Sequence, residues 1–319
     1  MLHTIVAGKS FVKCRRPGKG EIYVPGEIEH LQITANGLQF HVVAAGPADA
    51  PPILFLHGFP EGSLSWREVM QALSEYRVYA PDLRGYPGTE STRSGYDVIT
   101  LTEDIRGLIE ALKLSRPVLV SHDWGGALGW IFAHRYSDLI QRLIVINCTH
   151  PKTLTRAVIR VQDFQTLRSS YVLFLLVPRI PEILFTTAAG KKLLEFTCGL
   201  LEGHTDKRNM TLLGEMLSRF RIPNDMRGPI NYYRQLVLWQ LLRKRRATLD
   251  AVYQMPIAVP TTLIWGQKDR VLSESVARRS YLDAGCPVDF RILPDVGHFS
   301  QLESPLQVAN EIRWAITSA

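Results

Sequence analysis

Residues Val118–Gly126 read Val-Leu-Val-Ser-His-Asp-Trp-Gly-Gly and join two kinds of secondary structure. The stretch begins with apolar, partly β-branched residues, which are typical of a buried strand. From Gly125 onward, apolar residues recur at helical spacing. The turn between the two has Asp123 at its tip, and small neighbours let the backbone fold back without a Cβ clash. This pattern predicts a nucleophile elbow, which projects the side chain of Asp123 above a sheet.

Strands and helices alternate on both sides of this elbow, which predicts a mostly parallel sheet flanked by helices. An Asn36-Gly37 turn also predicts a hairpin near the start. The strands are expected at 30–34, 38–44, 53–56, 78–80, 118–121, 143–146, 261–265 and 289–293, and the helices at 66–76, 102–112, 275–283 and 305–317.

The alternation stops between about residues 151 and 255. This region is rich in Leu and Arg, shows helical periodicity and is interrupted by prolines, so it predicts an inserted helical cap. We therefore expect one core made of residues 29–149 and 257–319, a cap at 150–256, and a basic N-terminal extension at 1–28.

The composition is that of a soluble globular enzyme, with 46% apolar and 21% charged residues among 319. The net charge of +7 is modest, and the basic run Arg243–Arg246 lacks interleaved aromatics, so no nucleic-acid partner is expected. The four cysteines show no metal-binding spacing, which predicts reduced thiols, a cytoplasmic location, no metal and no cofactor. No apolar run approaches the ~18 residues of a membrane span. We expect a monomer or a homodimer.

Two further residues follow predicted strands and complete a catalytic set. Asp269 comes shortly after the strand that ends at Trp265, and His298 follows the strand that ends at Leu293. The order nucleophile, acid, histidine is that of the α/β-hydrolases, and reacting groups gather at the carboxyl ends of parallel strands. The sequence therefore predicts the α/β-hydrolase fold with Asp123, Asp269 and His298 as catalytic residues.

An aspartate at the elbow predicts a particular chemistry. A carboxylate with an ordinary pKa of ~3.9 is ionised at neutral pH and can attack a saturated carbon, which forms an ester. His298 can then deprotonate a water that attacks the carboxyl carbon of Asp123, while Asp269 orients the imidazole. The N–H groups of Phe59 and Trp124 are the expected oxyanion hole.

Epoxides and alkyl halides are the two electrophile classes that fit such a nucleophile. An opening epoxide develops an alkoxide, which needs a proton donor, and tyrosine with a pKa of ~10 is a suitable one. A halide needs only N–H donors around it. The side chains that the cap holds over Asp123 therefore decide between the two classes.

The motifs resemble those of the α/β-hydrolase-fold epoxide hydrolases of the soluble type. They are His57-Gly58-Phe59-Pro60, Ser121–Gly126, and Asp269 and His298 in their usual contexts, and the similarity runs from about residue 29 to the C-terminus. The resemblance implies a cis Phe59-Pro60 bond, the one class of peptide bond in which cis is common.

The same resemblance implies two ring-opening tyrosines from the cap. A Ser-Ser-Tyr segment matches Tyr171, and an Asn-aromatic-Tyr-Arg stretch after Gly-Pro selects Tyr233. Without the resemblance both would be read as core aromatics. Tyr232, one residue away, is the natural alternative to Tyr233.

The predicted function is the hydrolysis of a small apolar epoxide to a vicinal diol. The nearest alternative is a haloalkane dehalogenase, because those enzymes share the Asp-Trp-Gly elbow. They commonly carry Asn where this chain has Phe59, although a pair of Trp124 and Trp239 is able in principle to hold a halide. A non-catalytic binding protein of the same fold is the third alternative, and the complete catalytic set argues against it.

Overall fold

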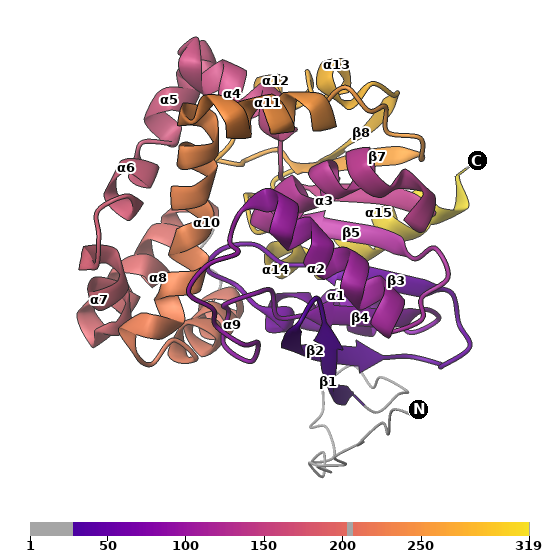
Figure 1. Ribbon diagram of the computed structural model, residues 1–319. Helices are drawn as coiled ribbons and strands as arrows, with labels where there is room; N and C mark the ends of the chain where they lie inside the picture. The colour runs from indigo at the N-terminus through magenta and orange to yellow at the C-terminus, as the bar shows by residue number, and fades with distance from the viewer. Residues whose placement is uncertain (1–27, 203–206, 319) are drawn as a thin grey trace.

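The structure is a computed structural model that describes residues 28–202 and 207–318. Nearly all of the predicted N-terminal extension at 1–28 lies outside the described residues. The described part contains one sheet with helices on both faces and a group of helices at one end (Figure 1).

The sheet has eight strands in the order β1-β2-β4-β3-β5-β6-β7-β8. Strand β2 is antiparallel to β1 and β4, and the remaining pairs are parallel, which confirms the mostly parallel sheet of the α/β-hydrolase fold. The strands are β1 (Glu29–Ala35), β2 (Leu38–Ala45), β3 (Pro52–Leu56), β4 (Arg77–Pro81), β5 (Val118–His122), β6 (Arg142–Ile146), β7 (Thr261–Gly266) and β8 (Val288–Leu293).

Alternating side chains of the central strand β5 build the core on both faces. Leu119 belongs to an apolar cluster with α2 (Val98–Ala111) and α3 (Asp123–Tyr136), whereas Val118 and Val120 pack with α1 (Arg67–Ala72) and α15 (Pro305–Thr317). This alternation is the two-residue period of a strand that is buried on both faces.

Two predicted helices differ from those observed. The helix expected at 66–76 is a short 3-10 turn, η1 (Ser63–Trp66), followed by α1. The helix expected at 275–283 is split into α12 (Glu274–Ala277) and α13 (Tyr281–Ala284). Buried Ser280 lies at the break, where its hydroxyl accepts the backbone N–H of His150 at 3.0 Å. A third short helix, α14 (Ser300–Glu303), precedes α15.

The elements between β6 and β7 are helical, and they gather beside the end of the sheet (Figure 1). The division into a core and a cap stays a prediction. The elements are α4 (Pro151–Ile159), η3 (Gln162–Phe164), α5 (Gln165–Arg168), α6 (Tyr171–Leu175), α7 (Ile180–Thr186), α8 (Ala188–Glu202), α9 (Lys207–Ser218), α10 (Pro223–Leu241) and α11 (Arg243–Val252).

No single helix of the described residues is long and apolar enough to cross a membrane. One bent pair, Gln162–Leu175 with Ile180–Thr186, meets the length and composition criteria together, with an 89° bend at the break.

Candidate active site

The elbow places Asp123 at the carboxyl end of β5 and at the start of α3. Its φ of 48° lies in the left-handed region, a conformation that a non-glycine residue adopts at a cost and that is common at functional sites. A Cβ at Gly125 would stand 2.3 Å from the carbonyl oxygen of Leu56, so the turn requires glycine there. The first turn of α3 directs its partial positive charge at the Asp123 carboxylate.

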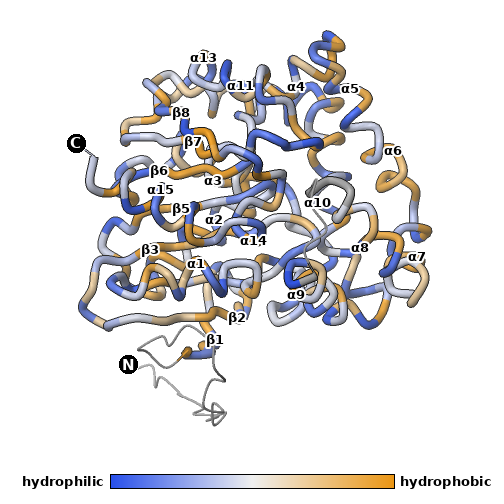
Figure 2. The backbone as a smooth tube through the Cα atoms, turned by 180° about the vertical axis from the view of Figure 1, so that it is seen from behind, coloured by the Kyte–Doolittle hydropathy of each residue, from blue (hydrophilic) through white to orange (hydrophobic). Residues whose placement is uncertain are grey.

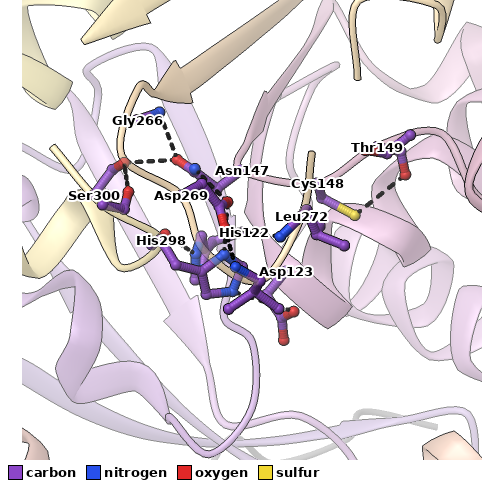
Figure 3. Close-up of polar contacts among 12 residues, drawn as sticks. His122, Asp123, Asn147, Cys148, Thr149, Gly266, Asp269, Leu272, His298 and Ser300 are labelled. Atoms are coloured by element: carbon purple, nitrogen blue, oxygen red, sulfur yellow. Dashed lines mark hydrogen bonds and ion pairs between the residues drawn. The ribbon is translucent and has the colours of Figure 1, made fainter. Parts of the chain in front are cut away.

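Asp123, His298 and Asp269 lie together at the carboxyl edge of the sheet (Figure 3). His298 Nδ1 lies 2.8 Å from Asp269 Oδ2, and His298 Nε2 lies 3.6 Å from Asp123 Oδ2. These residues follow β5, β7 and β8, and parallel strands bring their carboxyl ends to one edge. The structure therefore brings together the three side chains that the sequence predicted.

Asp269 is held by donors on both of its carboxylate oxygens. Oδ1 accepts the backbone N–H groups of Val271 at 2.7 Å and Leu272 at 2.9 Å. Oδ2 accepts the amide of Asn147 at 2.7 Å as well as facing His298. These bonds orient the carboxylate toward the imidazole.

Asn147 is a residue that the sequence analysis missed. Its side-chain oxygen accepts the N–H of Gly266 at 3.1 Å and the hydroxyl of Ser300 at 2.6 Å, so it links the loops after β6, β7 and β8 (Figure 3). Its position directly after a buried apolar strand, at the same edge as Asp123, was the available signal.

The charges of the cluster shift its pKa values in opposite directions. Burial opposes the charge on Asp123, but the hydrogen bond and charge of His298 outweigh burial and lower the pKa of the carboxyl. Burial likewise opposes a charged imidazole, yet Asp269 and Asp123 together raise the pKa of His298 well above its ordinary value. The free site thus favours an ionised Asp123 carboxyl beside a protonated His298 imidazolium.

One backbone N–H group donates to the Asp123 carboxylate, and a second candidate donor lies beside it. The N–H of Phe59 donates to Oδ1 at 2.9 Å, and the Phe59-Pro60 peptide bond is cis, as the resemblance implied. Trp124 lies in the first turn of α3, where backbone N–H groups have no acceptor within the helix. The predicted oxyanion-hole residues therefore both lie beside the elbow.

A buried pair lies behind the site. The His122 Nδ1 atom is 2.7 Å from Glu61 Oε1, and its Nε2 atom lies 2.9 Å from the backbone oxygen of His298. Glu61 Oε2 in turn accepts the N–H of Gly58 at 3.1 Å. The pair thereby connects the loop after β3, the elbow and the loop that carries His298.

Glu303 supports the His298 loop from α14. One carboxylate oxygen accepts the N–H of Gly297 at 2.7 Å, while the other is buried with no hydrogen-bond partner among residues 28–202 and 207–318. Burial is the largest cause that raises the pKa of Glu303, to about 7. The sequence analysis missed both Glu303 and Glu61, because each lies in a loop or short helix whose partners come from distant segments.

The two predicted tyrosines lie in contact with each other above the elbow. The ring of Tyr233, from α10, meets Trp124 edge-on at 4.9 Å, Phe59 at 5.5 Å and Tyr171 of α6 at 6.0 Å between centroids. Desolvation, with the charge of Asp123 adding to it, raises the pKa of both hydroxyls above the ordinary value of tyrosine, although Tyr171 as a whole is 43% exposed. Both therefore stay protonated at neutral pH.

Tyr232 has a different role in the fold. Its ring is fully buried, and its hydroxyl donates to the backbone oxygen of Arg84 at 3.1 Å. This bond ties α10 to the loop after β4 and occupies the Tyr232 hydroxyl. The geometry therefore favours Tyr233 over Tyr232 as the residue that faces Asp123.

The comparisons with known proteins agree with this geometry. Residues 51–305 match the α/β-hydrolase fold family. Epoxide hydrolase 4 from Homo sapiens is 34% identical over 292 residues, which cover 89% of this chain and 77% of that protein. The chain belongs to the epoxide hydrolase family of α/β-hydrolases.

Other members of the epoxide hydrolase family show the same likeness. Epoxide hydrolase 3 from Xenopus tropicalis is 33% identical over 299 residues, covering 90% of this chain and 77% of that protein. The crystal structure of an epoxide hydrolase from Vigna radiata superposes with a TM-score of 0.72 at 27% identity, covering 91% of this chain and 98% of that one. Family membership identifies the chain as an enzyme.

Within the described ranges, no group of three or more His, Cys, Asp or Glu side chains is arranged to hold a metal ion. The polar groups around Asp123 instead pair with one another, as described above.

Proposed function

We propose that the protein hydrolyses small apolar epoxides to vicinal diols through a covalent ester on Asp123. The observation that carries the proposal is the contact between the rings of Tyr171 and Tyr233, with the Tyr233 ring packed on Trp124 and Phe59 beside the Asp123 carboxylate. A nucleophile and proton donors that face each other suit a reaction in which a carbon–oxygen bond breaks as an oxygen gains charge.

In the first step, an Asp123 carboxylate oxygen forms a bond to one ring carbon and the ring C–O bond breaks. The hydroxyls of Tyr171 and Tyr233 donate hydrogen bonds to the departing oxygen, which takes a proton from one of them and becomes the first hydroxyl of the diol. The phenolate that is left takes a proton back from solvent. The lowered pKa of Asp123 keeps the nucleophile ionised.

The second step hydrolyses the ester. Once Asp123 is an ester it no longer carries a negative charge, so one of the two charges that raise the pKa of His298 is gone. The imidazolium of His298 then releases a proton to solvent more readily. The neutral imidazole can deprotonate a water that attacks the Asp123 carboxyl carbon. The Phe59 and Trp124 N–H groups stabilise the oxyanion until the ester C–O bond breaks. The departing alkoxide takes the proton that His298 removed from water and leaves as the diol.

The dehalogenase alternative has less support. Phe59 offers only its backbone N–H, which already bonds Asp123, and Trp239 lies six residues beyond Tyr233, or about 9 Å along α10. A halide would also have no use for two tyrosine hydroxyls beside the nucleophile.

The test combines turnover with trapping of the intermediate. We expect diol from aryl or aliphatic epoxides and no halide from matched haloalkanes. His298→Gln should accumulate protein with the mass of one added epoxide, and Asp123→Asn should gain no mass. Halide release without diol formation would favour the dehalogenase, and a wild-type protein that consumes neither substrate would refute the proposal.

A further inference from the structure

One edge of the helical segment between β6 and β7 exposes an unusual number of large apolar side chains. The apolar rim consists of Ile159, Val161, Phe164, Leu167, Leu173, Ile180 and Ile183, each more than half exposed. The elements that carry them, from the end of α4 through α7, follow one another along the side of the molecule away from the sheet (Figure 1). The tube is apolar over much of the same edge (Figure 2).

Scattered exposed apolar residues are normal, but a contiguous set marks a surface that binds something. The rim has the apolar composition of a membrane segment, since 162–175 and 180–186 together meet that criterion. The 89° bend and the short helices α5, α6 and α7 do not suit a span, which needs about 20 residues in one helix. Short apolar helices of this kind suit the plane of a membrane interface.

A basic groove of about 280 Å³ adjoins the rim between α4, α10 and α11. Ile159 lines it and also belongs to the rim, so the two surfaces are continuous. The charged side chains that line the groove are Lys152, Arg156, Arg160, Arg246 and Asp250.

Two arginines of the groove are available to bind an anion. Lys152 and Arg156 pair with Asp283, whereas none of the ion pairs found among the described residues includes Arg160 or Arg246. Tyr253 also lines the groove, and its buried hydroxyl has no hydrogen-bond partner among the described residues. The guanidinium groups of Arg160 and Arg246, outside every ion pair found in the described part of the chain, suit the oxygens of a phosphate.

We propose that the apolar rim docks onto the surface of a bilayer that contains anionic phospholipids, with a lipid phosphate in the basic groove. Apolar side chains of the rim enter the boundary between head groups and acyl chains, and the groove and the exposed run Arg243–Arg246 face the negatively charged head groups. The inference goes beyond the proposed activity, because it concerns where the enzyme binds and not what it converts.

The experiment measures flotation of the full chain with vesicles of phosphatidylcholine alone or with phosphatidylserine added. Wild type should float with the anionic vesicles. Leu167→Ser, Leu173→Ser and Ile183→Ser combined should lower the partition coefficient about tenfold or more. The matched control, Leu282→Ser with Leu306→Ser, removes two apolar side chains of similar exposure, 56% and 58%, outside the rim and should bind like wild type.

The groove is tested by Arg160→Gln with Arg246→Gln, which should weaken binding to anionic vesicles about tenfold and leave binding to neutral ones unchanged. Thermal unfolding of each variant shows that it is folded. Equal binding by the rim and control variants would overturn the proposal, as would no flotation at all. A wild-type dimer that the rim variant converts to a monomer, without flotation, would show that a second copy covers the rim.

Discussion

Replacing Tyr233 and its neighbour Tyr232 in turn by phenylalanine should give opposite results. Tyr233→Phe removes a hydroxyl beside Asp123 but keeps a ring that packs on Trp124 at 4.9 Å. Tyr232→Phe removes a hydroxyl that donates to the Arg84 carbonyl at 3.1 Å and has no part in the proposed mechanism. Each change deletes one oxygen from a buried ring on the same helix.

The two variants should lose different properties: Tyr233→Phe should lose catalytic rate, and Tyr232→Phe should lose stability. A general acid contributes about 10²–10⁴-fold to a reaction, and Tyr171 remains in the Tyr233→Phe variant. We therefore expect about a 10²-fold slower alkylation of Asp123, with little loss of stability. Tyr232→Phe should cost about 1 kcal/mol of unfolding free energy, the worth of one neutral hydrogen bond, and leave the alkylation rate within about twofold.

Single-turnover measurements separate these outcomes. Enzyme in excess over epoxide is quenched at intervals, ester and diol are quantified, and urea unfolding reports stability. The double change of Tyr171 and Tyr233 to phenylalanine should abolish ring opening in a folded protein. The reasoning is refuted if the double variant opens epoxides at the wild-type rate, or if Tyr232→Phe slows alkylation as much as Tyr233→Phe does.

Three further predictions follow from the loops around the site. Because the pKa of His298 is raised and hydrolysis needs the neutral imidazole, lowering the pH should slow ester hydrolysis before alkylation. Quenched mass spectra should show more ester on Asp123 at pH 5 than at pH 8, and equal amounts would contradict this. The fold favours protonated Glu303, because the pKa of this carboxyl is raised to about 7 in the folded protein. The protonated carboxyl therefore adds fully to the free energy of unfolding below the ordinary pKa of glutamate, and this contribution is lost as the pH rises through 7. Glu303→Gln should therefore gain about 1–3 kcal/mol of unfolding free energy over wild type between pH 5 and 8, and parallel pH profiles in urea would count against it. Asn147→Ala leaves buried partners unpaired and should lower the free energy of unfolding by about 2–4 kcal/mol. Because Asn147 orients Asp269, the variant should also hydrolyse the ester more slowly while its alkylation rate is unchanged. Equal slowing of both steps would show that it acts on the whole site.

Patterns within short stretches of sequence were sufficient to predict the elbow, the hairpin and the residues that follow the strands. The elbow at Asp123 is visible because an apolar strand, small residues and a helical period follow one another within a few positions. The hairpin at Asn36-Gly37 is equally local, and the register of Leu38 with Ala35 confirms it. Asp269 and His298 could be predicted because each follows a strand, and parallel strands deliver their carboxyl ends to a single edge.

Long-range contacts decided the rest. Asn147, Glu61 and Glu303 matter through partners on other loops, and the break between α12 and α13 lies at a serine that bonds distant His150. No period or motif within their own segments encodes those partners. Sequence reasoning therefore predicted the three side chains that meet at the carboxyl edge and missed much of what orients them.

The two adjacent tyrosines of α10 show the same limit most sharply. Neighbouring helical residues point about 100° apart, so only one of them can face Asp123. Without the resemblance, the sequence alone determined that a tyrosine pair lies in a helix between β6 and β7, and either member could have been the inward one. The packing of α10 against the loop at Arg84 decided it, because Tyr232 is used in that contact and Tyr233 is left to face the elbow. The chemical type of each residue can be read directly from the sequence, whereas the rotation of a helix about its own axis is set by the segments that pack against it.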